Sequence, residues 1–190
     1  MSCVTSRLSV AELVDRFGFI PHVADSPDRV DGVLPGGYDA YTCVLHALTT
    51  WSGKRTLYRE LTDLSWDQIS AVQDVSHRTP KGLAGTEGHL DRESALILID
   101  VLQIHGPARY VATYFFNPDE PVFNLSGDGL AQHLLSGGPP LGPLLWFPED
   151  LSWVASTPYD DWQTYLASSL DLATKVRERT EIETLICAAT

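Results

Sequence analysis

Hydrophobic positions recur along the chain with two periods, and the change between them comes near residue 108. The clearest helical pattern precedes that point, in "RESALILIDVLQIH" (residues 92–105). Asp91 stands before this segment as an N-cap, and Gly106 follows it as a stop signal. Its apolar residues run almost all the way round, which predicts a helix buried against more than one layer. The side chains that we expect to be almost fully buried are Leu96, Ile99, Leu102 and Trp153.

Four other segments carry helical spacing or a capping pattern. They are residues 10–17 after Ser9 and Glu12, a short helix opened by Ser65 and Gln68, a helix through "LAQHLL" opened by Ser126 or Gly127, and residues 170–179 capped by Ser168 with Asp171. Residues 24–37 are rich in turn formers and acids, which predicts a loop.

Strand patterns gather in the second half of the chain. They are "ARYVATYFF" (108–116) with its hairpin partner "PVFNL" (121–125), then "PLLWF" (143–147), "LSWVAST" (151–157), "DWQTYLAS" (161–168) and "IETLICA" (182–188). Short turns between successive strands indicate antiparallel neighbours. With residues 38–46, the total is about seven strands and five helices. We therefore expect a single α+β domain over residues 1–190, with a mainly antiparallel sheet and helices packed on one face.

The segment "GGYDAYTCVLHAL" (36–48) raises the question of a reactive pair, because Cys43 and His46 lie three residues apart. On a helix they would share a face and could act as thiolate and base, or as metal ligands. Strand-favouring residues and two leading glycines indicate a central strand instead. On a strand the two side chains leave on opposite faces. We expect Cys43 to be a buried, inert thiol and His46 to be partly exposed at the strand end.

Composition narrows the classes of partner. The net charge of −12 disfavours binding to nucleic acid and allows a basic protein partner. Three cysteines without regular spacing suit reduced thiols in a cytoplasm. The start of the sequence does not read as a signal peptide, and no segment is long and apolar enough to cross a membrane. The oligomeric state is left open.

Motifs for catalysis, metal binding or a cofactor do not emerge from the sequence. The six histidines are scattered, there is no G-x-S-x-G, and the glycine-rich "KGLAGTEGH" lacks a G-K-[ST] ending. We therefore assign no catalytic residue, no metal site and no cofactor.

Aromatic and acidic residues are the remaining candidates for binding. Trp146, Trp153 and Trp162 fall on three successive predicted strands, where they either fill the core or form an exposed aromatic patch. On 151–157, Trp153 and Ala155 share one face, which predicts a polar outer face for Ser152, Val154 and Ser156. The residues that we assign to a binding surface are Asp25, Asp28 and Asp31 in the acidic loop, with Trp146 and Trp162.

The stretch "LLWFPEDLSWVASTPYDDWQTYLASS" (144–169) resembles an uncharacterised family of small actinobacterial proteins with a C-terminal W-P-E-D-x-S-W segment. "YDAYTCVLH" (38–46) is similar to that family's tyrosine-containing strand ending in histidine. Phe147 is an insertion within the W-P-E-D segment. The resemblance implies a soluble, cytoplasmic α+β protein and carries over no catalytic residue.

Two functional hypotheses follow. The first is a non-catalytic binding protein, such as an inhibitor or immunity-type domain for a basic protein partner. The second is a small bacterial enzyme of secondary metabolism, tailoring or hydrolytic, whose site is assembled only in the fold. A deep apolar pocket with converging histidine and acid side chains would favour the enzyme, and a flat or convex acidic face with an aromatic centre would favour the binding protein.

Overall fold

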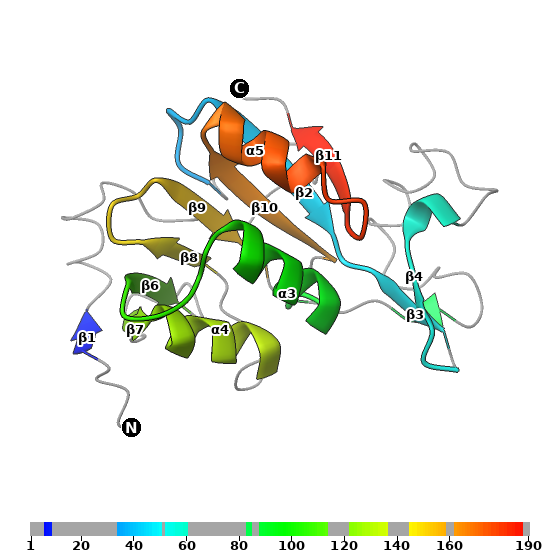
Figure 1. Ribbon diagram of the computed structural model, residues 1–190, viewed down its shortest axis with the longest axis horizontal. Coiled ribbons are helices and arrows are strands. Elements are labelled where there is room, and N and C mark those ends of the chain that lie inside the picture. The colour runs from blue at the N-terminus through cyan, green and yellow to red at the C-terminus, as the bar shows by residue number, and fades with distance from the viewer. Residues whose placement is uncertain are drawn as a thin grey trace.

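The computed structural model describes residues 6–8, 34–50, 52–60, 83–84, 88–113, 122–136, 145–158 and 162–187. Its main sheet has eight strands in the order β1-β7-β6-β8-β9-β10-β2-β11. Their bounds are β1 Ser6–Leu8, β2 Ala40–Leu45, β6 Arg109–Thr113, β7 Val122–Ser126, β8 Leu145–Pro148, β9 Trp153–Ser156, β10 Gln163–Ser168 and β11 Glu183–Cys187. Every neighbouring pair is antiparallel, which confirms the predicted α+β class with an antiparallel sheet (Figure 1).

Short connections set the order of the central strands, as their spacing in the sequence predicts. β8 and β9 are joined by a tight turn in which Leu151 has a φ of 55° and its N–H donates to the carbonyl of Pro148. β9 then pairs with β10, and β10 pairs with β2 in the register Tyr165 to Cys43. β2 lies between β10 and β11, so it is an interior strand, as predicted.

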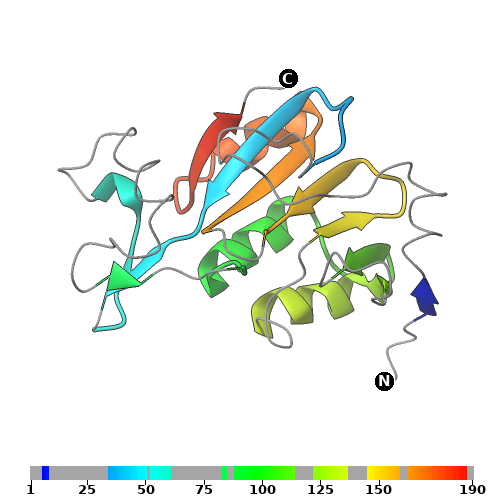
Figure 2. The same cartoon turned by 180° about the vertical axis from the view of Figure 1, so that it is seen from behind.

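Three helices cover one face of the sheet: α3 (Arg92–Val101), α4 (Gly127–Ser136) and α5 (Leu170–Arg177) (Figures 1 and 2). The core between helices and sheet is centred on Trp146 and Trp153, whose rings meet edge to face with centroids 5.4 Å apart. Leu102 and Trp153 are buried, as predicted. The prediction for Leu96 is wrong: this residue is 46% exposed, because α3 has one face turned to solvent. Ile99 is only partly buried.

The opposite face of the sheet is also buried, which corrects the expected polar outer face of residues 151–157. Val154 and Ser156 are fully buried, and only Ser152 is exposed. This second core contains Tyr41, Cys43, Leu45, Val111, Phe147 and Tyr165 from the sheet, together with Leu34 and Tyr58 from outside it. Both faces of the central strands are therefore packed.

Two helix ends differ from the sequence prediction. α3 begins after Asp91, whose side chain accepts from the N–H of Ser94, but it ends at Val101 instead of residue 105. Its last turn closes when Gln103 takes a φ of 54°, and the chain then leaves the helix before Gly106. α5 is capped by Ser169, whose hydroxyl accepts from the N–H of Leu172. Ser168, the predicted cap, is the last residue of β10.

A second, three-stranded sheet was not predicted. It has the order β4-β3-β5, with β3 Leu48–Thr50, β4 Arg55–Thr56 and β5 Leu83–Ala84, and the 3-10 helix η1 (Tyr58–Glu60) follows β4. Arg55 joins this sheet to α3, because its Nε lies 3.0 Å from Asp91 Oδ1. Burial raises the pKa of Asp91, but hydrogen bonds from Ser94 and from the N–H of Ala47, with the charge of Arg55, outweigh burial and lower it.

Several predictions fall outside the described residues. They are the helix at 10–17, the helix opened by Ser65, and the acidic loop that holds Asp25, Asp28 and Asp31.

Candidate functional site

Cys43 and His46 lie on opposite faces of the sheet, as the strand interpretation predicts. The thiol of Cys43 packs in the second core and lies 3.5 Å from the side-chain oxygen of Gln163. His46 follows the end of β2, and its Nε2 lies 2.9 Å from Thr164 Oγ1 on the helix-covered face. Thr164 in turn lies 2.8 Å from Thr157 Oγ1. The two side chains therefore cannot work as a thiolate and its base.

The expected partial exposure of His46 is wrong, since the residue is 0% exposed. The backbone explains this burial. His46 N–H donates to the carbonyl of Trp162 at 2.8 Å, which extends the β2–β10 pairing one residue beyond the strand. The imidazole is thereby held on the helix-covered face of the sheet, where it forms a hydrogen bond with the hydroxyl of Thr164. This arrangement indicates a structural role for the ring.

The three tryptophans divide between the two faces of the sheet. Trp146 is 0% exposed and Trp153 is buried beside it, so core filling is the correct alternative for both. Trp146 consequently cannot contact a partner at the surface of the folded chain. Trp162 is half-buried and packs against the second core. The structure does not bring Trp146 and Trp162 together into one patch.

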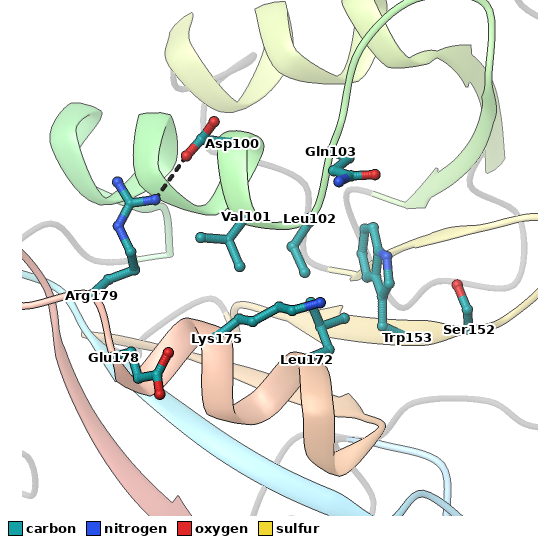
Figure 3. A pocket seen from close by; sticks show the side chains of 10 residues that line it. All are labelled: Asp100, Val101, Leu102, Gln103, Ser152, Trp153, Leu172, Lys175, Glu178 and Arg179. Carbon is teal, nitrogen blue, oxygen red and sulfur yellow. Dashed lines mark hydrogen bonds and ion pairs between the residues drawn. The ribbon is translucent and has the colours of Figure 1, made fainter.

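A pocket of about 580 Å³ opens between α3, α5 and the start of β9 (Figure 3). We call it the α3–α5 pocket. It is lined by Asp100, Val101, Leu102, Gln103, Ser152, Trp153, Leu172, Lys175, Glu178 and Arg179. Ligand-binding clefts commonly have volumes of about 300–1,000 Å³, so the size suits a small molecule or a few side chains of a larger partner.

Local structure explains why these residues meet. Leu102 and Glu178 are the C-cap residues of α3 and α5, so the C-terminal ends of both helices border the pocket. The positive φ of Gln103 turns the chain away after α3 and leaves the space open. Trp153 and Leu172 supply apolar surface, while Arg179 and Glu178 lie at the other end of the pocket (Figure 3).

The charges around the α3–α5 pocket are unequal. Arg179 binds Asp100 at 2.7 Å and Glu181 at 3.3 Å, and Lys175 binds Asp171 at 2.7 Å. The hydrogen bond to Asp100 is the main reason that the pKa of Arg179 is raised. Glu178 has no ion-pair partner among the described residues. Of the residues that line the pocket, Asp100 and Glu178 balance Lys175 and Arg179; Asp171 and Glu181, which lie outside the lining, bring the six named groups to a net charge of −2.

The helix ends add to this negative potential. The last carbonyl groups of a helix carry a partial negative charge, which favours a nearby cation by about 0.3–1 kcal/mol. The C-cap residues Leu102 and Glu178 both line the pocket, so the last turns of α3 and α5 border it, and Leu172 brings the first turn of α5 to it as well. The α3–α5 pocket is therefore suited to a positively charged group above an apolar floor.

Catalytic and metal chemistry find little support in the described residues. The lining of the pocket contains neither histidine nor cysteine. No group of three or more histidine, cysteine or acidic side chains suited to a metal ion occurs in the part of the chain that the structure describes.

Sequence reasoning missed the α3–α5 pocket, because its residues come from three separate segments: 100–103, 152–153 and 172–179. The one local signal was the charged stretch that closes α5, where Lys175 and Arg177 precede Glu178.

No protein-family model matches the chain, and neither a curated protein nor a solved structure is significantly similar to it. The resemblance of residues 144–169 to the small actinobacterial family therefore stays a prediction. Among the described residues, no helix has both the length and the apolar character needed to cross a membrane.

Proposed function

We propose that the chain is a non-catalytic binding protein for a basic protein partner, and that the α3–α5 pocket receives a lysine or arginine side chain of that partner. The observation that carries the proposal is the carboxylate of Glu178, which has no ion-pair partner among the described residues and lines the same pocket as the apolar side chains of Trp153 and Leu172. A partner's cation would gain an ion-pair partner there without displacing Lys175 or Arg179 from theirs.

The charge of the whole chain supports the same class of partner. A net charge of −12 attracts a basic surface over a distance and speeds its association. An inhibitor or immunity-type domain, which masks a basic partner, would use such steering. A cytoplasmic location is part of this proposal, since three cysteines without regular spacing suit reduced thiols.

The enzyme hypothesis has less support. It requires a pocket in which a base and an acid converge, and His46 is enclosed within the fold, away from the α3–α5 pocket. Cys43, the other candidate for chemistry, lies on the opposite face of the sheet and is 1% exposed.

The test is a titration of the isotope-labelled chain with N-acetyl-arginine methylamide, followed by amide correlation spectra. We expect saturable shifts confined to residues 100–103 and 172–179, and no such shifts with N-acetyl-glutamate methylamide. Glu178→Lys should abolish them. Asp39→Lys, which makes the same charge change at an exposed residue outside the pocket, should retain them.

Two results would overturn the proposal. One is a set of shifts spread over the acidic surface and equally weakened by both variants, because that pattern indicates unspecific attraction. The other is the absence of any saturable shift in the pocket. Thermal melts of both variants should match the parent, which separates loss of binding from loss of fold.

A further inference from the structure

The strand β11 forms one edge of the eight-stranded sheet (Figures 1 and 2). Among the described strands it pairs only with β2, in the register Leu185 to Cys43 and Ile186 to Thr42. Half of the main-chain N–H and C=O groups of an edge strand point away from the sheet. Such a row of groups is a template on which another extended chain can pair.

The side chains of β11 leave this edge open to pairing. Ile186 is 74% exposed, although it is the fourth of the five residues of this strand. The strand contains no lysine, arginine or proline, which are the residues that commonly protect an edge. Its single charged residue, Glu183, is only 5% exposed. The exposed part of β11 is therefore uncharged and β-branched.

We infer that β11 is a self-association surface, on which the β11 strand of a second copy of this chain pairs antiparallel about a two-fold axis. The sheets of the two copies then form one continuous sheet. A two-fold interface brings the same residues of both copies together, so the strand must be compatible with itself.

The β11 sequence meets this condition when the axis passes beside Leu185, the central residue of the strand. Thr184 of each copy then faces Ile186 of the other, a pairing of two β-branched side chains that suits neighbouring strands. Glu183 faces Cys187, so the acid never opposes its own copy. All five residues of β11 are paired in this register.

A strand from a different protein would be the alternative occupant. The self-pairing is favoured because the exposed part of β11 offers no charge to complement, whereas the proposed partner of the α3–α5 pocket is basic. The two sites are also separate: no residue of β11 lines that pocket. The self-association can therefore fail or succeed independently of the proposed function.

The first test measures molar mass by light scattering across a series of concentrations. We expect the parent to reach twice the mass of the chain and Ile186→Lys to remain a monomer. Leu96→Lys, the same change at an exposed leucine of α3, should dimerise like the parent. A parent that stays monomeric at every concentration, or a dimer that Ile186→Lys leaves intact, would overturn the inference.

The second test traps the register and does not depend on a destabilising variant. In a background of Cys3→Ser and Cys187→Ser, the double variant Thr184→Cys with Ile186→Cys should form a covalent dimer on mild oxidation. Facing residues of antiparallel strands have Cα atoms about 4.5–5.5 Å apart, within the range of a disulfide. Neither single variant should crosslink. No covalent dimer from the double variant, or equal crosslinking by a single one, would refute this pairing.

Salt separates the two surfaces further. Each copy carries a net charge of −12, so raising the ionic strength should strengthen self-association by screening repulsion. Binding of a basic probe at the α3–α5 pocket should weaken under the same conditions. Dimerisation that weakens as salt is added would contradict an uncharged strand interface.

Discussion

Replacing Gly127 by alanine tests a backbone contact on which the arrangement of α3, β6 and α4 depends. α4 begins directly after β7, so its first residue must pass close to the chain that leaves α3. A Cβ added to Gly127 would lie 2.5 Å from the carbonyl oxygen of His105 and 2.6 Å from its carbonyl carbon and its nitrogen. Non-bonded carbon atoms prefer separations of about 3.5–4.0 Å, so the overlap is roughly 1 Å with three backbone atoms.

Relief of this overlap requires the start of α4 to move away from His105. That movement strains the hydrogen bond from Gly127 N–H to Ala108 O at 2.8 Å, and the one from Gly106 N–H to Asp128 Oδ1 at 2.8 Å. Overpacking typically costs about 1–3 kcal/mol and each weakened hydrogen bond about 0.5–1.5 kcal/mol. We expect Gly127→Ala to lower the free energy of unfolding by about 3 kcal/mol or more.

The assay is urea unfolding and thermal melting, both followed by circular dichroism. A loss of about 3 kcal/mol in a chain of this size lowers Tm by roughly 6–12 °C. Gly36→Ala is the matched control, because an added Cβ there has no atom within 4 Å, and it should change stability by less than about 0.5 kcal/mol. Equal melts for Gly127→Ala and the parent would show that the close approach to His105 is not a feature of the folded chain.

Two further predictions concern stability. Leu102→Ala should cost about 2–5 kcal/mol in urea unfolding, whereas Leu96→Ala, at a half-exposed position, should cost much less; equal losses would contradict the orientation of α3. Asp91→Asn should be less stable than the parent above pH 3.8, the ordinary pKa of the group, because the folded-state pKa of Asp91 is lowered. The parent should lose this advantage as the pH falls below 3.8, so the free energies of unfolding of the parent and of Asp91→Asn should converge in acid. A constant difference between them from neutral pH to strong acid would show that the carboxylate charge is not responsible.

The late strands were predictable because two local signals agree there. Hydrophobic and polar residues alternate along each strand. The turn at 149–152 is so short that β8 and β9 must pair with each other. The three-stranded sheet lacks both signals. β4 and β5 are two residues long, so no alternation can be read from them, and the partner of β3 in β5 lies more than thirty residues away in the sequence.

Burial on the second face of the sheet was harder to predict, because small polar residues such as serine and threonine occur both in cores and at surfaces. Ser156 looked like a solvent-facing residue, yet it pairs with Leu145 on one side and Tyr165 on the other. His46 likewise read as a strand-end residue near solvent. A single hydrogen bond across strands, from its N–H to Trp162, decides its position, and such a bond leaves no trace in the periodicity.

The packing of both faces explains where binding can take place in this fold. In β2, β8 and β10 almost all side chains on both faces are enclosed, and Cys43, Trp146 and His46 are at most 1% exposed, so they are inaccessible to a partner of the folded chain. Among the described residues, two places at the periphery stay accessible: the α3–α5 pocket, which charged side chains border at the helix ends, and the edge strand β11, where Ile186 is exposed. The two proposals call for different partners at these two places: a cation at the pocket and a second β11 strand at the sheet edge. If both proposals hold, pairing of two copies along β11 would leave the α3–α5 pocket accessible to a basic protein, because no residue of β11 lines that pocket.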